Sequence, residues 1–284
     1  MRQPLFPLVI TAFLALMLCS VFGSCASPND TPETAGSDDD SSNSDDDSMT
    51  IDDDGGSNLD PLRFAVEVVD YHIGVNGGYG ESKLPGSVLG PPAGKGDFSQ
   101  QESDDQVLSL GHGGYIVLRL GYEIIDGDGI DFIIFENPFK PSGLDDVVFT
   151  EAAVVEVSQD GIDWHRFPFD YNPDGPGDAP YANPVNFHGL AGITPVYANP
   201  NEGIDPLNPE VSGGDGFDLA DVGLEKAAYV KIIDTGCNIK APGTQIVDDN
   251  GDLVDDYGNH FPLSENKEGF DLDAVAVIHF GDPT

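Results

Sequence analysis

Three acidic segments of the chain carry side chains that could bind a hard cation. In the first, residues 126–131, Asp126, Asp128 and Asp131 alternate with glycine directly before an apolar run. Glycine lets the backbone turn tightly enough for alternate carboxylates to converge on one ion, and calcium prefers carboxylate and carbonyl oxygens. These three aspartates are therefore predicted calcium ligands. The alternative is an acidic surface that keeps the protein soluble without binding an ion.

The second acidic pattern is the tetrapeptide Gly-Phe-Asp-Leu, which occurs twice, at residues 216–219 and 269–272. In an extended strand the Phe and Leu side chains lie on one face and the Asp on the other. Both copies are followed by a further aspartate, so we predict that they deliver carboxylates to one polar or metal site; the four residues are Asp218, Asp221, Asp271 and Asp273. The alternative is that each aspartate caps a turn by accepting hydrogen bonds from backbone amides.

The third segment resembles a calcium loop because Asp248, Asn250 and Asp252 occupy alternating positions. It departs from the helix–loop–helix version, which has glycine at the sixth position and a closing glutamate, whereas Asn259 stands at the closing position here. The three residues are candidate metal ligands. A solvated acidic insertion is the alternative.

Aromatic residues gather in the segment 171–197, among asparagine and proline. Flat rings beside amide groups can stack on a sugar, so four residues are candidate ligand-binding groups: Tyr171, Tyr181, His188 and Tyr197. They could equally pack against the body of the domain.

Motifs for nucleophilic or zinc catalysis are missing from the sequence. The segment 111–114 faintly resembles an oxyanion loop, but no Gly-x-Ser-x-Gly sequence accompanies it, and no two histidines stand four residues apart. We therefore expect a protein that is not an enzyme. A glycoside hydrolase that uses two carboxylates remains an alternative, because a chain this acidic can bring any two of them together.

The elements that must position these residues are short β-strands. Branched and aromatic runs separated by Gly, Pro, Asn and Asp predict strands at 64–71, 115–122, 131–135, 153–158, 163–167, 228–233 and 274–280. Asp160 and Gly161 between two of these runs predict a hairpin with a tight turn, for which both would supply positive φ angles. Long loops rich in glycine, proline and aspartate lie at 72–113, 168–216 and 236–270. The pattern predicts an all-β fold, a two-sheet β-sandwich with elaborate loops.

The amino terminus has the pattern of an exported lipoprotein. A basic Arg2, an apolar run over 5–22 and the small residues before Cys25 predict a signal peptide over 1–24 and lipidation of Cys25. An uncleaved membrane anchor and an ordinary secretory signal are the alternatives. Residues 25–60 are acidic and poor in apolar residues, which predicts a disordered linker between a lipid anchor and a domain over 61–284.

Charge and cysteine usage agree with this location. The chain has 51 acidic against 11 basic residues, a net charge of −40, so nucleic acid is not expected as a partner. Of the three cysteines, Cys237 alone would remain unmodified in the mature protein, so no intrachain disulfide is expected. We predict a bacterial cell-envelope protein, lipid-anchored at the outer membrane or cell surface.

Six motifs occur in order over nearly all of residues 61–284: VLGPP (88–92), VLSLGHGG (107–114), DGDGIDFIIFENP (126–138), VEVSQDGIDW (155–164), GFDLADVG (216–223) and GFDLDAV (269–275). Together they resemble a bacterial family of exported proteins described only as cell surface proteins. The resemblance implies a galactose-binding-like (discoidin-type) jelly roll, a fold that hosts carbohydrate binding, adhesion and calcium sites. We therefore expect a calcium-stabilised β-sandwich that binds an extracellular ligand, a glycan or an extracellular protein. A structural envelope protein without a small ligand and a hydrolase are the alternatives.

Overall fold

The computed structural model describes residues 59–284 except 102, 142–143, 145 and 262–265. The predicted signal peptide, Cys25 and the linker up to residue 58 lie outside the described residues. The described part consists of strands and short 3-10 turns without an α-helix, which confirms the all-β fold class. No helix in this part is long and apolar enough to cross a membrane.

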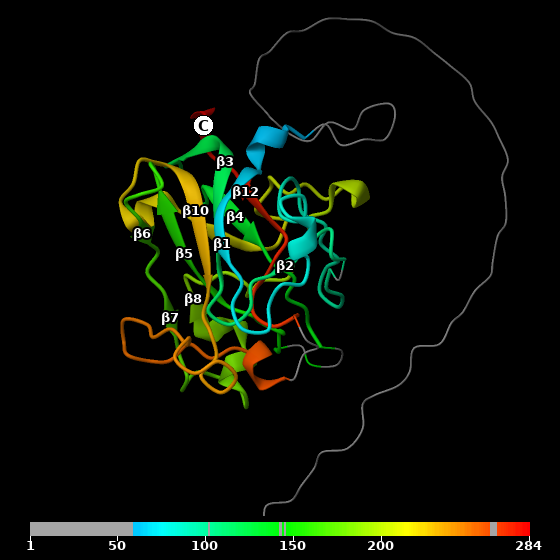
Figure 1. Ribbon diagram of the computed structural model, residues 1–284, viewed down its shortest axis with the longest axis vertical. Coiled ribbons are helices and arrows are strands. Elements are labelled where there is room, and N and C mark those ends of the chain that lie inside the picture. Colours follow the sequence, from blue (N-terminus) through cyan, green and yellow to red (C-terminus); the bar gives the residue numbers. More distant parts are fainter. Residues whose placement is uncertain (1–58, 102, 142–143, 145, 262–265) are drawn as a thin grey trace, which may run out of the picture. The chain divides into compact units, whose positions relative to one another are not determined.

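The larger of two main sheets is antiparallel and has five strands in a row, with a sixth on the end of its long strand (Figure 1). Their order is β1 (Ala65–His72), β3 (Tyr115–Ile125), β10 (Lys226–Asp234), β5 (Ala153–Ser158) and β6 (His165–Arg166), and β13 (Phe280–Pro283) also pairs with β3.

Smaller antiparallel sheets complete the domain. A three-stranded sheet has the order β12 (Ala274–Val277), β4 (Phe132–Phe135) and β9 (Asp215–Phe217). Two further pairs join β11 (Asp271–Leu272) to β2 (Leu108–Ser109) and β7 (Asp170–Tyr171) to β8 (Phe187–His188). The 3-10 turns are η1 (Pro61–Arg63), η2 (Glu81–Lys83), η3 (Pro180–Ala182), η4 (Pro184–Asn186), η5 (Pro200–Glu202), η6 (Leu219–Val222) and η7 (Gly258–His260).

The main core lies between the large sheet and the three-stranded sheet. Alternate residues of β3, including Ile116 and Leu118, pack in one cluster with Phe132 and Ile134 of β4, and all four are 0% exposed. The other face of β4 is also buried, because Ile133 and Phe135 pack against Phe64, Val196 and Ala198. Burial on both faces explains why β4 is an uninterrupted apolar run. In Figure 1 the two sheets overlap in projection, as expected for layers of a sandwich packed face to face.

The seven predicted strands are present, with shifted ends at most of them. The hairpin of β5 and β6 also forms, but its ladder stops at Val157 and His165, so its loop is longer than the predicted tight turn. Gly161 has a φ of 75°, whereas Asp160 keeps a negative φ and instead accepts hydrogen bonds from the amides of Ile162 and Asp163. The short strands β2, β7, β8, β9 and β11 lie inside or at the edge of segments predicted as loops.

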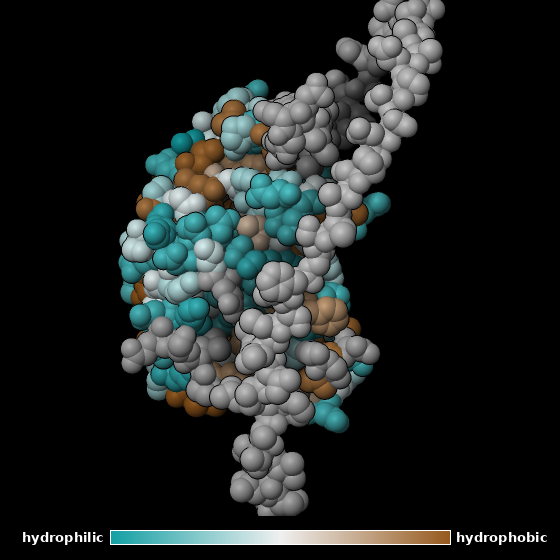
Figure 2. Space-filling model, turned by 90° about the vertical axis from the view of Figure 1, so that its right-hand side faces the viewer, coloured by the Kyte–Doolittle hydropathy of each residue, from teal (hydrophilic) through white to brown (hydrophobic). Residues whose placement is uncertain are grey.

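The surface is mostly polar. Figure 2 shows a face on which hydrophilic residues predominate and hydrophobic ones form small separate patches. Large apolar side chains that are exposed, such as Phe98, Ile162 and Ile239, lie far apart in the sequence. Cys237 is a buried free thiol, as expected for a small apolar core residue.

Candidate metal centre

Three carboxylates meet where several strands end at one end of the sandwich. Glu136 directly follows β4, Glu151 precedes β5 by one residue, and Asp271 begins β11. One oxygen from each of the three side chains lies within 4.8 Å of the others. Glu136 is 2% and Glu151 is 4% exposed, whereas Asp271 is half-buried, so the group lies below the surface with Asp271 toward solvent.

Hydrogen bonds hold the carboxylates in place but leave oxygens of two of them without partners. The Oε1 atom of Glu136 accepts a hydrogen bond from the amide of Asp271 at 3.2 Å, and the Oδ2 atom of Asp271 accepts one from Asn137 Nδ2 at 3.2 Å. The remaining oxygens, Glu136 Oε2 and Asp271 Oδ1, are buried and accept no hydrogen bond of ordinary geometry among the described residues. The Asn137 amide lies close enough to Glu136, and the Ser109 hydroxyl to Asp271 across the β2–β11 ladder, to lower the pKa of each carboxyl. A buried carboxylate oxygen without a partner is costly unless a cation or a proton neutralises it.

Burial and mutual repulsion raise the pKa values of the three carboxyl groups. Burial raises the pKa of Glu136 well above its usual range, and the charge of Asp271 raises it further. Burial, followed by the charges of Asp271 and Glu136, acts in the same direction on the pKa of Glu151. Burial raises the pKa of Asp271 to about 6. No described lysine, arginine or histidine side chain forms an ion pair with any of the three.

The backbone around Glu151 is closely packed on its side chain. A Cβ atom on Gly258 would lie 2.6 Å from Glu151 Cγ and 2.8 Å from its Oε1 atom, so glycine is required here for the carboxylate to keep its position. Gly258 is itself held by a hydrogen bond from its amide to the carbonyl of Thr150 at 3.0 Å. The backbone at Gly258 thus limits where the Glu151 side chain can lie.

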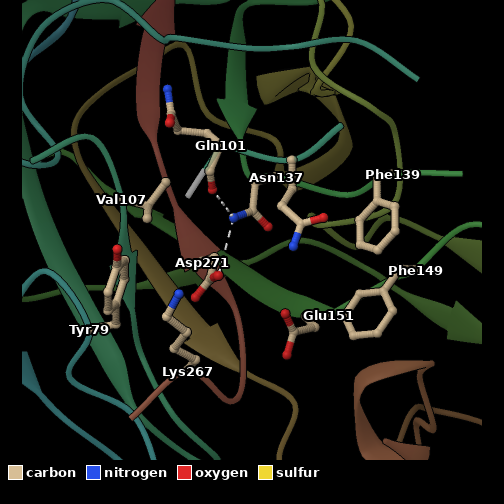
Figure 3. A pocket seen from close by; sticks show the side chains of 10 residues that line it. Tyr79, Gln101, Val107, Asn137, Phe139, Phe149, Glu151, Lys267 and Asp271 are labelled. Atoms are coloured by element: carbon tan, nitrogen blue, oxygen red, sulfur yellow. Dashed lines mark hydrogen bonds between the residues drawn. The ribbon is translucent and has the colours of Figure 1, made fainter. Parts of the chain in front are cut away.

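A pocket opens onto this group (Figure 3). Its cavity has a volume of about 110 Å³. This is smaller than the roughly 300–1,000 Å³ of drug-sized ligand sites, so it suits a small ligand group rather than a large molecule. Its lining combines aromatic, amide and charged side chains: Tyr79, Gln100, Gln101, Val107, Asn137, Phe139, Phe149, Glu151, Lys267 and Asp271. Figure 3 shows Glu151 and Asp271 between Tyr79 on one side and Phe149 on the other. The rings of Phe139 and Phe149 stack at 5.2 Å and 15°.

The predicted ligands Asp126, Asp131 and Asp218 form a second group with oxygens within 4.8 Å of one another. Asp131, which is 0% exposed, already has partners for both oxygens. Its Oδ1 atom accepts the Gly127 amide and pairs with His279 Nδ1, both at 2.8 Å, and its Oδ2 atom accepts the Leu219 amide at 2.7 Å. These contacts account for the burial of Asp131 without an ion.

The two Gly-Phe-Asp-Leu repeats bury their apolar residues as predicted, but their aspartates belong to different groups. Asp218 lies with Asp126, whereas Asp271 lies with Glu136 and Glu151. Asp218 also accepts a hydrogen bond from the amide of Ala220 at 2.9 Å, which is the turn-capping alternative. Asp273 is buried and accepts the amide of Ala93 at 2.9 Å, and the exposed Asp128 and Asp221 join neither group.

The acidic loop at 248–252 is closed by its own backbone. Asp248 Oδ1 accepts the amides of Asn250 and Asp252, and its Oδ2 atom accepts the amide of Tyr171 at 3.0 Å. Asn250 donates to the carboxylate of Asp170. The aspartate at the start of this loop thus acts as a turn cap, and Asp252 is not part of either carboxylate group among the described residues.

The four candidate ligand-binding aromatic residues do not come together. Tyr171 is 3% exposed and packs on Phe187, so it belongs to the core. Tyr181 stacks on His260 at 3.7 Å, Tyr197 donates to Asp97, and His188 is exposed on β8. The segment 111–114 forms a turn in which the buried His112 pairs with Glu268 at 2.8 Å.

A buried carboxyl beside the site predicts a pH dependence of stability. Asp256 accepts the amides of Ala152 at 2.9 Å and Asn259 at 3.1 Å, and burial raises its pKa to about 7. The folded protein therefore retains this proton where the unfolded chain has lost it, and its stability falls as the pH rises from about 4 to about 7. Between pH 5 and pH 8, the free energy of unfolding of the parent should fall by about 2 kcal/mol more than that of Asp256→Asn. Urea unfolding with calcium present measures both values. A difference that does not change with pH would contradict this.

Glu136 and Glu151 were not among the predicted ligands, although a local signal marks each. Glu136 directly follows the four buried apolar residues of β4, and Glu151 stands next to the apolar run 152–155 that enters β5. A charge at the end of a fully buried strand needs a neutralising partner. What the sequence does not indicate is that these two ends lie beside Asp271.

No protein-family model matches the chain, and a search of characterised proteins found no match either.

Proposed function

We propose that the protein is a lipid-anchored, non-enzymatic cell-surface protein whose β-sandwich binds calcium at Glu136, Glu151 and Asp271 and uses this end of the domain to bind an extracellular ligand. The observation that carries the proposal is a pair of buried oxygens, Glu136 Oε2 and Asp271 Oδ1, that accept no hydrogen bond of ordinary geometry and belong to a group of three carboxylates. A hard cation with oxygen ligands would satisfy both.

The local charge supports a divalent rather than a monovalent ion. Three ionised carboxylates carry three negative charges, and the nearby positive group that acts on them is Lys267, which lowers the pKa of Asp271. Two positive charges would neutralise these groups, and the charges of Asp234 and Asp256, which also raise the pKa of Glu151, add to the demand for a divalent ion. Calcium tolerates the irregular geometry of carboxylates from three separate elements better than magnesium, which requires a near-ideal octahedron.

The predicted location supports calcium as well. The signal peptide over 1–24, the lipidated Cys25 and the acidic linker would place the domain at the outer membrane or cell surface. Extracellular calcium modules bind their ion with dissociation constants of about 10⁻⁴–10⁻³ M, so three carboxylates and a few neutral oxygens suffice. The net charge of −40 argues against nucleic acid as a partner.

A calcium titration of the full-length, chelator-stripped protein by isothermal calorimetry tests the cation site. We expect one ion per chain at these three residues and a loss of affinity of at least tenfold in Glu136→Gln. The matched control is Asp126→Asn, in the second acidic group, which should bind as the parent does. The cation site would be wrong if the parent bound no calcium, or if Asp126→Asn abolished binding and Glu136→Gln did not.

A hydrolase is the second candidate, because Glu151 and Asp271 both line the pocket and both have raised pKa values. A protonated carboxylic acid beside a carboxylate is the pair that glycoside hydrolysis requires. Turnover of oligosaccharides in the presence of a chelator, lost in Glu151→Gln, would establish it. The non-enzymatic proposal expects no release of reducing sugar from either protein.

A further inference from the structure

We infer that the cation forms the floor of the pocket shown in Figure 3, and that a neutral sugar completes its coordination through two adjacent hydroxyl groups. The inference rests on the proposed calcium site and names the ligand class and the place where it binds.

The arrangement of the three carboxylates leaves one side of the ion open. Glu151 and Asp271 are part of the pocket wall, whereas Glu136 is buried and does not line the pocket. A cation bound by all three is therefore reached from the pocket. Calcium takes roughly six to eight oxygen ligands. The three carboxylates supply fewer than this, because some of their oxygens already accept hydrogen bonds. The remaining positions face the pocket, where ligand hydroxyls can fill them.

The pocket wall has the two kinds of surface that a sugar ring requires. Phe139 and Phe149 form a stacked apolar pair, and Phe149 is held in place by an edge contact with Tyr257 at 5.1 Å. An apolar wall of this kind packs against the C–H face of a pyranose. The side chain of Asn137 lies on the same lining, where its Nδ2 atom donates to Gln101 O and to Asp271 Oδ2. Its Oδ1 atom is the group that can accept a hydrogen bond from a further hydroxyl.

The charge of the site selects a neutral ligand over an anionic one. Lys267 lines the pocket, with its Nζ atom 4.1 Å above the ring of Tyr79. A divalent ion together with this ammonium group balances the three carboxylates. A uronic or sialic acid would add a negative charge with no partner to a protein of net charge −40. Hydroxyl groups bind the ion without that cost.

The test is saturation-transfer NMR on the full-length protein with the methyl glycosides of mannose, galactose, glucose and glucuronic acid, in calcium and then in excess chelator. The three neutral probes offer cis and trans adjacent hydroxyls. We expect at least one of them to bind in calcium and to lose its signal in chelator, and glucuronic acid to bind more weakly.

Two variants separate the sugar from the ion. Phe139→Ala removes part of the apolar wall and touches none of the three carboxylates, so it should bind calcium as the parent does and the sugar about fivefold more weakly. Phe98→Ala, at an aromatic residue that is 70% exposed and outside the pocket, is the matched control and should bind both as the parent does.

Each result bears on one of the two proposals. Calcium binding without binding of any neutral probe would overturn the sugar inference and leave the calcium site standing. Sugar binding that persists in chelator, stronger binding of glucuronic acid, or an unchanged sugar affinity in Phe139→Ala would overturn the inference as well. Absence of calcium binding would overturn the calcium site and, with it, the inference.

Discussion

Removal of calcium is expected to lower the thermal unfolding midpoint of the full-length protein by about 5–10 °C at pH 7.5. An ion present at 100 times its dissociation constant stabilises the folded state by about 2.7 kcal/mol. For a domain of this size each kcal/mol corresponds to roughly 2–4 °C. Scanning calorimetry in about 10 mM calcium, which is about 100 times a dissociation constant of 10⁻⁴ M, and in excess chelator measures the difference.

In the same experiment, Glu136→Gln is expected to be more stable than the parent in one condition and less stable in the other. Without calcium the variant should be more stable than the parent, because a neutral amide removes one of three buried charges that repel one another. With calcium it should be less stable, because the ion has lost a ligand. Asp126→Asn, at an exposed residue, should respond to chelator as the parent does.

The pH dependence of the chelator effect follows from the raised pKa values of Glu136, Glu151 and Asp271. In chelator and at low pH, the three carboxyls are protonated in the folded protein and carry no charge. As the pH rises from about 4 through 6 and above, the unfolded chain releases these protons more readily than the folded protein does, so the free energy of unfolding falls. The gain in stability on adding calcium should therefore be small at pH 5 and large at pH 8. A calcium stabilisation that is equal at both pH values, or that is undiminished in Glu136→Gln, would place the ion elsewhere.

Asp131→Ala should destabilise the domain by about 3–5 kcal/mol, the cost of breaking a buried network around a charge. The substitution leaves the amides of Gly127 and Leu219 without their acceptor and removes the partner of His279. These three contacts join the turn before β4 to the start of η6 and to the residue before β13, so their loss loosens one end of the sandwich. Urea unfolding measures the change.

The control variants distinguish a structural Asp131 from a calcium ligand. Asp126→Ala, which changes an exposed neighbour in the same carboxylate group, should cost less than about 0.5 kcal/mol. The loss in Asp131→Ala should be the same in calcium and in chelator. If chelator destabilised the parent but left Asp131→Ala unchanged, the ion would bind at Asp131 and the structural role assigned to this residue would be wrong.

Local patterns predicted the strands well because strand formation depends on alternation and on apolar runs of a few residues. The alternation of Ile116, Leu118 and Leu120 places β3 with one face in the core, and the run 132–135 marks a strand buried on both faces. The short strands β2 and β11 escaped prediction because each has two residues and is stabilised by its partner rather than by its own pattern.

The acidic segments show where local reasoning fails for a site. Asp126 and Asp131 are close together as their glycine-rich surroundings predicted, whereas Asp218, which was predicted to lie with Asp271, joins them instead. Backbone amides and His279 already satisfy Asp131. Asp248 likewise caps its own turn. Carboxylates beside glycine serve turns and ions equally well, and the distinction depends on which donors lie within reach.

Composition and local patterns were enough to predict the all-β class, most strand positions and the excess of acidic groups, because each of these depends on neighbouring residues or on composition. The folded arrangement was needed to show that Glu136, Glu151 and Asp271 come together, whereas the aspartates of the two Gly-Phe-Asp-Leu segments lie in different groups. Antiparallel pairing of β4 with β12 and of β2 with β11 brings residues 135 positions apart into contact. The partners of a buried charge are set by strand order and register, which no local stretch of the chain contains.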